Sequence, residues 1–458
     1  MIGSPRYASG GREDALLGAD AILDPLRAAL RDAPADEAEL WLHRRRAAVT
    51  RYSRSAIHQN ALSDEIHVQA RAVVGGALGI VTTNSLEVGV LRRALADAAE
   101  LARQQPPSEE WPGLAEPEPE PVVGRAAFDP ATAAADAFEQ ARAVAAICEA
   151  VAAARLRAAG THHVDLTEDA VASSRGLALY APATVAYVRA LVQSDVGSGY
   201  AEDLGSRLDR LDARSVAQRA IEKCLLDRDR TPLPPGDYEA VFEELAVAEI
   251  LRVMSLTGLG AESVREGRSF MSDRIGETVT GERFTLHDDA LDPRTLGIPF
   301  DIEGTPKRRV PLVERGIAKG PVYDRTSAKA MGVRSTGHAA DPSRYQRGGH
   351  AGNLTMEGGT ATREELIGSV RRGVLITRFH YTNIPDPRRA TMTGTSRDGT
   401  FLIEDGRITR ALANVRYTMS ALDLFAGIEL LGPQRLARDW WSSNGMGSIV
   451  CLCPPMKV

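Results

Sequence analysis

The sequence lacks the short motifs that identify most soluble enzymes and nucleotide-binding proteins. It has no G-x-S-x-G elbow, no P-loop and no G-x-G-x-x-G turn after a strand, which argues against an α/β-hydrolase and a nucleotide-binding protein. Cys451 and Cys453 have the wrong spacing for a zinc knuckle. His162 and His163 would point to opposite faces of a strand, so they do not share a metal. The sequence thus predicts no catalytic residue and no metal ligand in this chain.

The sequence also lacks a net excess of positive charge and long apolar runs. The formal net charge of -6 argues against nucleic acid or an anionic membrane as the main partner, because both attract basic surfaces. No apolar run is long enough to span a bilayer, and residues 1–12 contain no apolar core of a signal peptide. Four cysteines in 458 residues do not make a disulfide scaffold. We therefore expect a cytoplasmic protein with no nucleic-acid and no membrane partner.

The N-terminal half contains one pattern twice: a strand, a turn, a strand of small residues and an alanine-rich helix. In the first copy the strands are predicted at residues 65–72 and 77–82, and the helix at 85–103 with Ser85 as its N-cap. In the second copy the strand is predicted at 187–193 and the helix at 213–226. A long alanine-rich helix is expected at 129–158, and a Pro- and Glu-rich exposed linker at 104–121. Together these features predict two copies of one α/β unit.

A second proline-rich stretch at residues 230–236 marks the next boundary, because short strands and turns follow it. Strand pieces are predicted at 310–312 and 401–403, a hairpin turn at 404–406 and a late helix at 420–431. We expect an α+β protein with a duplicated N-terminal α/β unit and a β-rich C-terminal domain. The predicted domains are 1–229, with repeats at about 35–105 and 126–229, and 230–458.

Two polar clusters in the C-terminal half are candidates for substrate binding. One is His350 with Asn353, next to a pair of glycines. The other mixes aromatic, amide and cationic groups that suit a peptide backbone or a carboxylate; it consists of Arg378, His380, Tyr381, Asn383, Arg388 and Arg389. If 378–383 is a strand, alternation places Arg378 and His380 on one face. The alternative is a polar strand and loop at a subunit surface.

Several segments of the C-terminal half resemble the TldD/PmbA (TldE) family, which is related to metallopeptidases. The run from Gly267 to Glu277 is similar to the family's glycine–serine–aromatic element. Residues 300–304 resemble its Asp-x-Glu-Gly element, and residues 323–337 resemble its tyrosine, alanine and Ser-Thr-Gly signature. The order and spacing of these segments carry the resemblance, which extends over nearly the whole chain.

The catalytic members of that family carry H-E-x-x-x-H on a helix upstream of the glycine–serine run. Counting back from that run aligns the first histidine, the glutamate and the second histidine of this motif with Arg252, Val253 and Thr257. All three motif residues are therefore missing from this chain. The segment 244–256 has apolar residues at helical spacing and predicts a helix packed in a core. The family's C-terminal Cys-Gly ligand element is not recognisable here.

The resemblance implies a non-catalytic, TldE-like subunit of a heteromeric metallopeptidase that processes unfolded or modified peptides. Its expected partner is a TldD-like subunit that bears H-E-x-x-x-H and holds the zinc, while this chain holds no cofactor. Two alternatives remain open from the residues. One is a homo-oligomeric peptide-binding or scaffolding protein, and the other is an enzyme with metal-free chemistry around His350 or His380.

Overall fold

The structure of the chain is a computed structural model that describes residues 15–118, 127–341, 348–438 and 449–458. The prediction about residues 1–12 lies outside these ranges. Among the residues so described, no helix has the length and apolar character needed to cross a membrane.

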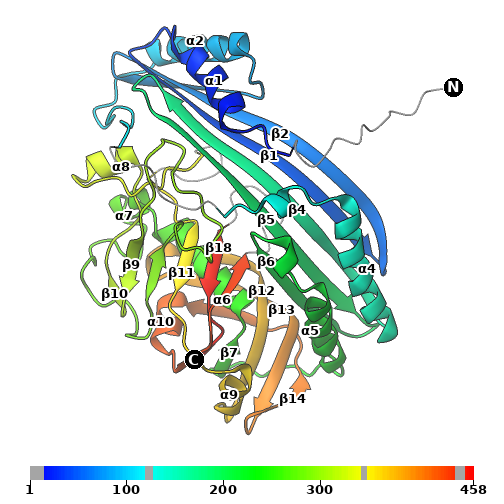
Figure 1. Cartoon of the computed structure of the whole chain (residues 1–458). Helices are drawn as coiled ribbons and strands as arrows, with labels where there is room; N and C mark the ends of the chain where they lie inside the picture. Colours follow the sequence, from blue (N-terminus) through cyan, green and yellow to red (C-terminus); the bar gives the residue numbers. More distant parts are fainter. Residues whose placement is uncertain (1–14, 119–126, 342–347, 439–448) are drawn as a thin grey trace, which may run out of the picture.

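The N-terminal half is built on one six-stranded antiparallel sheet with the order β3-β2-β1-β4-β5-β6. The first three strands and the last three mirror each other about the β1–β4 pair, which confirms the predicted duplication. The long strands form an arch (Figure 1). The strands are β1 (Glu37–Ser53), β2 (Ala56–Val74), β3 (Ala77–Thr83), β4 (Arg157–Ser173), β5 (Ala178–Gln193) and β6 (Ser198–Gly205).

One face of this sheet is covered by helices, and the other faces the C-terminal half. Leu40 and Ala170 pack among helix residues, whereas their neighbours Trp41 and Val171 pack with Phe300 of the C-terminal half. This is the alternation expected of a sheet buried on both sides. The helices of this half are α1 (Ala19–Leu30), α2 (Val88–Arg103), α3 (Pro130–Ala133), α4 (Ala137–Ala153), η1 (Leu208–Arg210) and α5 (Ala213–Leu226).

Two helix predictions were wrong at their boundaries. Helix α2 begins at Val88 rather than after Ser85, whose hydroxyl instead accepts a hydrogen bond from the N–H of Glu87. The single helix predicted at 129–158 is broken in two, because Asp136 starts a new helix with a capping box to Glu139. The capping residue, rather than the alanine content, determines where α4 starts.

The C-terminal half contains two further sheets, with the orders β10-β9-β8-β11-β18-β17 and β14-β13-β12-β7-β19-β16, and β15 pairs with β13. Their strands are β7 (Glu239–Phe242), β8 (Leu286–Asp288), β9 (Val310–Glu314), β10 (Ile317–Ala318), β11 (Asn353–Met356), β12 (Arg372–Asp386), β13 (Thr391–Glu404), β14 (Arg407–Ala411), β15 (Arg416–Ser420), β16 (Leu430–Leu431), β17 (Arg435–Arg438), β18 (Val450–Cys453) and β19 (Met456–Lys457). These strands confirm the predicted α+β class with a β-rich C-terminal domain. The predicted boundary at 229/230 falls in the connection from α5 to β7.

The helices of this half are short except for α6, which lies in its largest core. They are α6 (Glu244–Gly258), α7 (Ala261–Arg265), α8 (Arg325–Ala330), α9 (Arg363–Gly368), η2 (Pro387–Arg389) and α10 (Ala421–Ala426). The hairpin turn between β13 and β14 is confirmed, with positive φ angles of 48° at Asp405 and 72° at Gly406. The late helix is shorter than predicted: Ser420 caps it, and it ends at Ala426.

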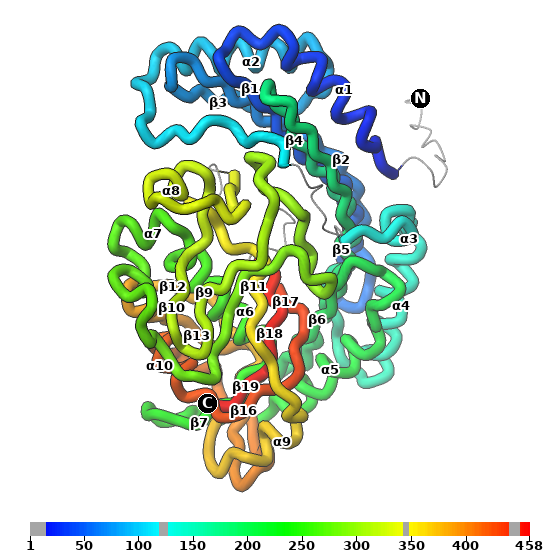
Figure 2. The backbone as a smooth tube through the Cα atoms, turned by 60° about the vertical axis from the view of Figure 1, so that its left-hand side comes forward, coloured from blue at the N-terminus to red at the C-terminus, as the bar shows by residue number. Residues whose placement is uncertain are grey.

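The segment predicted as an exposed linker is partly packed between the two halves. Leu114 and Ala115 are buried, and the indole N–H of Trp111 donates to Glu37 on the sheet. From the C-terminal half, Arg325 donates to the carbonyl of Leu114 and Lys329 to that of Trp111. The prediction was wrong for these residues because proline excludes a helix but not burial. Residues 119–121 of the predicted linker lie outside the described ranges. In Figure 2 this cyan segment runs between the arch and the C-terminal half.

Candidate functional site

A cavity of about 300 Å³ lies between the sheet of the N-terminal half and the loops and strands of the C-terminal half. This volume is at the lower end of the range for small-molecule sites, about 300–1,000 Å³. The polar side chains that line it come from both halves: His43, Asp165, Thr167, Asp169, Asp301, Lys307, Asp341, His350, Asn353 and Arg438.

On the sheet wall the carboxylates are paired with basic side chains of the same sheet. Asp165 receives two hydrogen bonds of 3.0 Å from the guanidinium of Arg45. Burial raises the pKa of Asp165, and Arg45 opposes this shift. Asp169 lies 2.9 Å from the Nδ1 of His43. These acids are therefore already engaged and leave little capacity for a ligand cation.

On the opposite wall, Asp301 is held by backbone amides. Its two oxygens accept from the N–H groups of Glu303, Thr305 and Ala339 at 2.8–3.0 Å. Burial and the neighbouring Glu303 raise its pKa to about 7, although these hydrogen bonds favour the ionised form. Asp301 thus shapes the loop that forms this wall.

Beneath this wall lies a buried His–Asp pair that the sequence reasoning missed. The Nε2 of His338 lies 2.9 Å from Asp288, whose second oxygen accepts the N–H of Asn353 at 2.9 Å. Burial acts to raise the pKa of Asp288, but His338, Lys307 and the Asn353 amide together lower it to about 2. Both side chains of the pair are fully shielded from solvent. The pair ties the loop that carries His338 to β8, and the hydrogen bond from Asn353 ties β8 to β11. No motif marks His338 in the sequence; only the fold brings it to Asp288.

The first predicted cluster lies in this cavity. His350 and Asn353 both line it, and the backbone N–H of His350 donates to the carbonyl of His338 at 2.9 Å. Burial lowers the pKa of His350 to about 4, so its imidazole is neutral at pH 7. These two residues are placed where a ligand between the two halves would contact them.

The second predicted cluster does not line the cavity, because its members belong to β12 and η2. Arg378 is buried, donates from Nε to Asp398 at 2.9 Å and lies 4.4 Å from the ring centre of Tyr200. His380 lies 3.0 Å from the guanidinium of Arg397, which helps burial to lower its pKa. Arg378 therefore joins β12 to the N-terminal sheet instead of facing the cavity.

The remaining members of this cluster are on the surface. Tyr381 is 59% exposed and has a φ of 54°, which interrupts the regular alternation predicted for 378–383. Asn383 donates to the carbonyl of Tyr381 at 2.9 Å. Arg388 pairs with Asp273 at 3.3 Å, and Arg389 is largely exposed. The strand is irregular here because the β12–β13 register shifts between His380 and Asn383.

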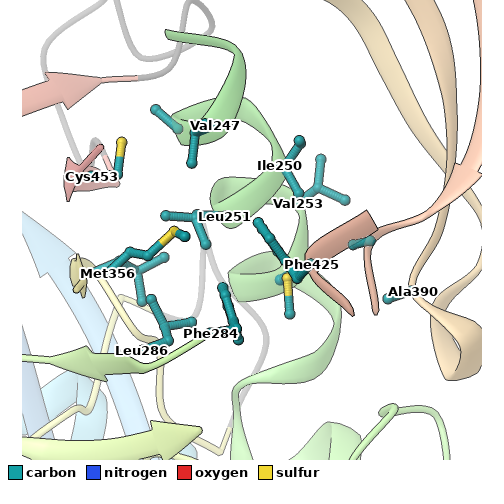
Figure 3. Packing of buried hydrophobic residues seen from close by; sticks show 14 of the residues in the cluster. Val247, Ile250, Leu251, Val253, Phe284, Leu286, Met356, Ala390, Phe425 and Cys453 are labelled. Carbon is teal, nitrogen blue, oxygen red and sulfur yellow. The ribbon is translucent and has the colours of Figure 1, made fainter. Parts of the chain in front are cut away.

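The positions aligned with the family's metal motif lie on α6, whose predicted packing in a core is confirmed (Figure 3). Arg252 donates twice to Glu249 at 3.1 Å, Val253 is 2% exposed, and the hydroxyl of Thr257 donates to the carbonyl of Val253. A guanidinium and an isopropyl group supply no zinc ligand, so these residues do not fit a metal. The thiols of Cys451 and Cys453 donate to carbonyls of α6.

Comparison with known proteins agrees with this architecture. The PmbA/TldA metallopeptidase C-terminal domain matches residues 235–453. A metalloprotease TldD homolog of Buchnera aphidicola is 29% identical over 249 residues, which is 54% of this chain and 50% of the relative. The chain spans about half the length of the curated relatives it matches.

Two solved structures share the fold over most of the chain. The structure of TldE from Thermococcus kodakarensis superposes with a TM-score of 0.83 at 22% identity, covering 94% of this chain and 98% of that one. A putative modulator of a DNA gyrase from Thermotoga maritima gives a TM-score of 0.76 at 19% identity, covering 92% and 94%.

The fold and the matched C-terminal domain define a metallopeptidase-related protein. Residues 235–453 match the C-terminal domain of this family, which confirms the resemblance to the TldD/PmbA family found in the sequence.

Proposed function

We propose that this chain is a non-catalytic, TldE-like subunit of a heteromeric metallopeptidase. The proposal rests on the side chains of α6 at the positions aligned with the metal motif. Where the resemblance places the metal motif, Arg252 forms an ion pair with Glu249, and Val253 is packed in the core. Rebuilding a metal site there would require replacing side chains that already stabilise the helix.

The proposed partner is a TldD-like subunit that carries H-E-x-x-x-H and holds zinc, and the proposed substrate is an unfolded or modified peptide. The cavity between the two halves supports a binding role, because it is lined by peptide-compatible donors such as Asn353 and Lys307. The alternative of metal-free chemistry at His380 has less support, since this imidazole lies against Arg397 and outside the cavity.

Reconstitution with an H-E-x-x-x-H relative from the same genome tests the proposal. We expect no cleavage of an unfolded peptide by this chain alone, cleavage by the mixture, and a mixed complex by size-exclusion chromatography with light scattering. A variant of the relative with its motif glutamate replaced should assemble but not cleave. Chelator-insensitive cleavage by this chain alone contradicts the proposal. A stable homo-oligomer that does not bind the relative contradicts it as well.

A further inference from the structure

One row of side chains crosses three neighbouring strands at the wall of the cavity. Asn353 on β11 and Arg438 on β17 are both register partners of Val450 on β18, the strand between them. Side chains in register on adjacent strands point to the same face, and all three residues line the cavity. With a strand spacing of about 4.8 Å, the Cα atoms of Asn353 and Arg438 lie roughly 10 Å apart.

The donors in this row are not used within the protein. Among the described ranges, no hydrogen bond or ion pair involves the side chain of Asn353 or that of Arg438. The Nε and Nη2 atoms of Arg438 are buried without a hydrogen-bond partner, and the residue is only 5% exposed. Arg438 lies close enough to Asp165 to lower the pKa of that carboxyl, but its Nε and Nη2 atoms form no hydrogen bond. Buried donors without an acceptor are costly, so this guanidinium is a candidate for binding an anion.

Arg378 stacks on a tyrosine as Arg438 does, but its guanidinium is hydrogen-bonded to a carboxylate. Arg378 and Arg438 both stack on tyrosines of the N-terminal sheet, at 4.4 Å from the ring of Tyr200 and 3.7 Å from that of Tyr187. For Arg378, the Nε and Nη2 atoms both bind the carboxylate of Asp398. In Arg438 these are the two atoms that lack a partner. A ligand carboxylate at Arg438 would take the place that Asp398 has at Arg378.

Lys307 adds a second positive charge to the same cavity. Its ammonium takes part in no ion pair within the described part of the chain, and it lies close enough to Asp288 and Asp301 to lower the pKa of each. Three acids of the lining are engaged: Asp165 by Arg45, Asp169 by His43 and Asp301 by backbone amides. Lys307, Asn353 and Arg438 supply two cations and one amide to the same lining.

We propose that this cavity binds the carboxylate of a peptide, held by Lys307, Asn353 and Arg438. The carboxylate is either the C-terminus or an acidic side chain, since both present the same planar pair of oxygens to a guanidinium and an ammonium. This assignment rests on the proposed function for the peptide as carrier of the carboxylate. It does not require a partner subunit, because every residue involved belongs to this chain.

Calorimetric titration of the isolated chain tests the assignment with four N-acetylated alanine-rich peptides. One has a free C-terminus, one a C-terminal amide, and two are amides that carry an internal Glu or Gln. We expect the free acid or the Glu peptide to bind at least about ten-fold more tightly than its uncharged counterpart, equivalent to about 1.4 kcal/mol. Tighter binding of only one acid identifies the source of the carboxylate.

Variants separate this site from general electrostatics. Lys307→Met and Asn353→Ala should each weaken binding of the acidic peptide by about ten-fold. Lys319→Met removes the same charge outside the cavity, where Lys319 pairs with Glu314, and should leave the affinity unchanged. Equal affinity for acid and amide peptides, or an unchanged affinity in both cavity variants, overturns the assignment. Peptide binding without activity in the reconstituted mixture would instead contradict only the proposed function.

Discussion

The buried charge of Asp288 is held by specific partners rather than by solvent. Asp288 lies in the core of the C-terminal half between His338 and the backbone of Asn353, and its side chain is fully shielded from water. Such a carboxylate is stable as an anion only while its partners remain in place. Its charge therefore contributes to folding in a way that depends on pH.

Replacing Asp288 with asparagine should lower the free energy of unfolding, most strongly at neutral pH. The pKa of Asp288 is about 2 in the folded protein and 3.8 without the fold, so the charged group stabilises the protein above pH 3.8. This contribution is about 2 kcal/mol and disappears as the pH falls from 3.8 towards 2. Chemical denaturation of both proteins at pH 7 and pH 3 measures the difference.

Asp24→Asn is the matched control, because the side chain of Asp24 is 71% exposed and pairs with Arg27 one turn away. It should shift the unfolding midpoint little at either pH. A loss in Asp288→Asn that is the same at pH 7 and pH 3 would show that packing, rather than charge, accounts for the role of Asp288.

At the scale of elements, the two N-terminal repeats use the same contact between strand and helix. Gly79 on β3 lies so close to α2 that an added Cβ would be 1.9 Å from the carbonyl oxygen of Ala98. Gly199 on β6 is placed in the same way against Ala220 of α5, at 2.1 Å. The absence of a side chain lets each helix approach its strand closely, which explains why small residues recur in both copies.

Gly79→Ala and Gly199→Ala should therefore each destabilise the protein by about 1–3 kcal/mol, because a methyl group must push backbone atoms of the helix aside. Thermal denaturation measures the loss. Gly89→Ala is the control: it lies in α2 with nothing within 4 Å of an added Cβ, and it should be neutral or stabilising by up to about 1 kcal/mol. Equal effects at all three glycines would rule out the close contact as the cause.

At the scale of the whole molecule, a buried arginine links the two halves. Arg71 on β2 lies 3.2 Å from Glu39 of the same sheet and 3.2 Å from Glu303 of the C-terminal half. Burial raises the pKa of Glu39 to about 7, with Arg71 opposing the shift. The guanidinium thus compensates charge from both halves at a place that is largely shielded from water.

Arg71→Met should destabilise the protein by about 3–5 kcal/mol at pH 8, because it leaves buried carboxylates without a counter-ion. The loss should be smaller at pH 6, where Glu39 is protonated in the folded protein and needs no compensation. Denaturation monitored by circular dichroism at both pH values provides the test. Arg92→Met, which removes an exposed pair with Asp32, should show neither the loss nor the pH dependence.

Local patterns in the sequence determined the type of several elements of this protein. Helix α5 matches its predicted range of 213–226, and the hairpin turn predicted at 404–406 is present, with positive φ angles at Asp405 and Gly406. Both depend on contacts between residues close in sequence, such as caps and backbone conformation. The sequence also contains a local signal for the split of the helix predicted at 129–158: Asp136 and Glu139 have the spacing of a capping box, which marks the start of a new helix.

Only the tertiary structure decided which polar residues meet. Arg378 and Arg438 are both arginines on strands, and nothing in their neighbours distinguishes them. One is paired because Asp398 is brought beside it by the β12–β13 pair, and the other faces a cavity because β17 lies next to β18 opposite the N-terminal sheet. Pairing of this kind depends on strand register and on the docking of the two halves, which no local pattern of residues encodes.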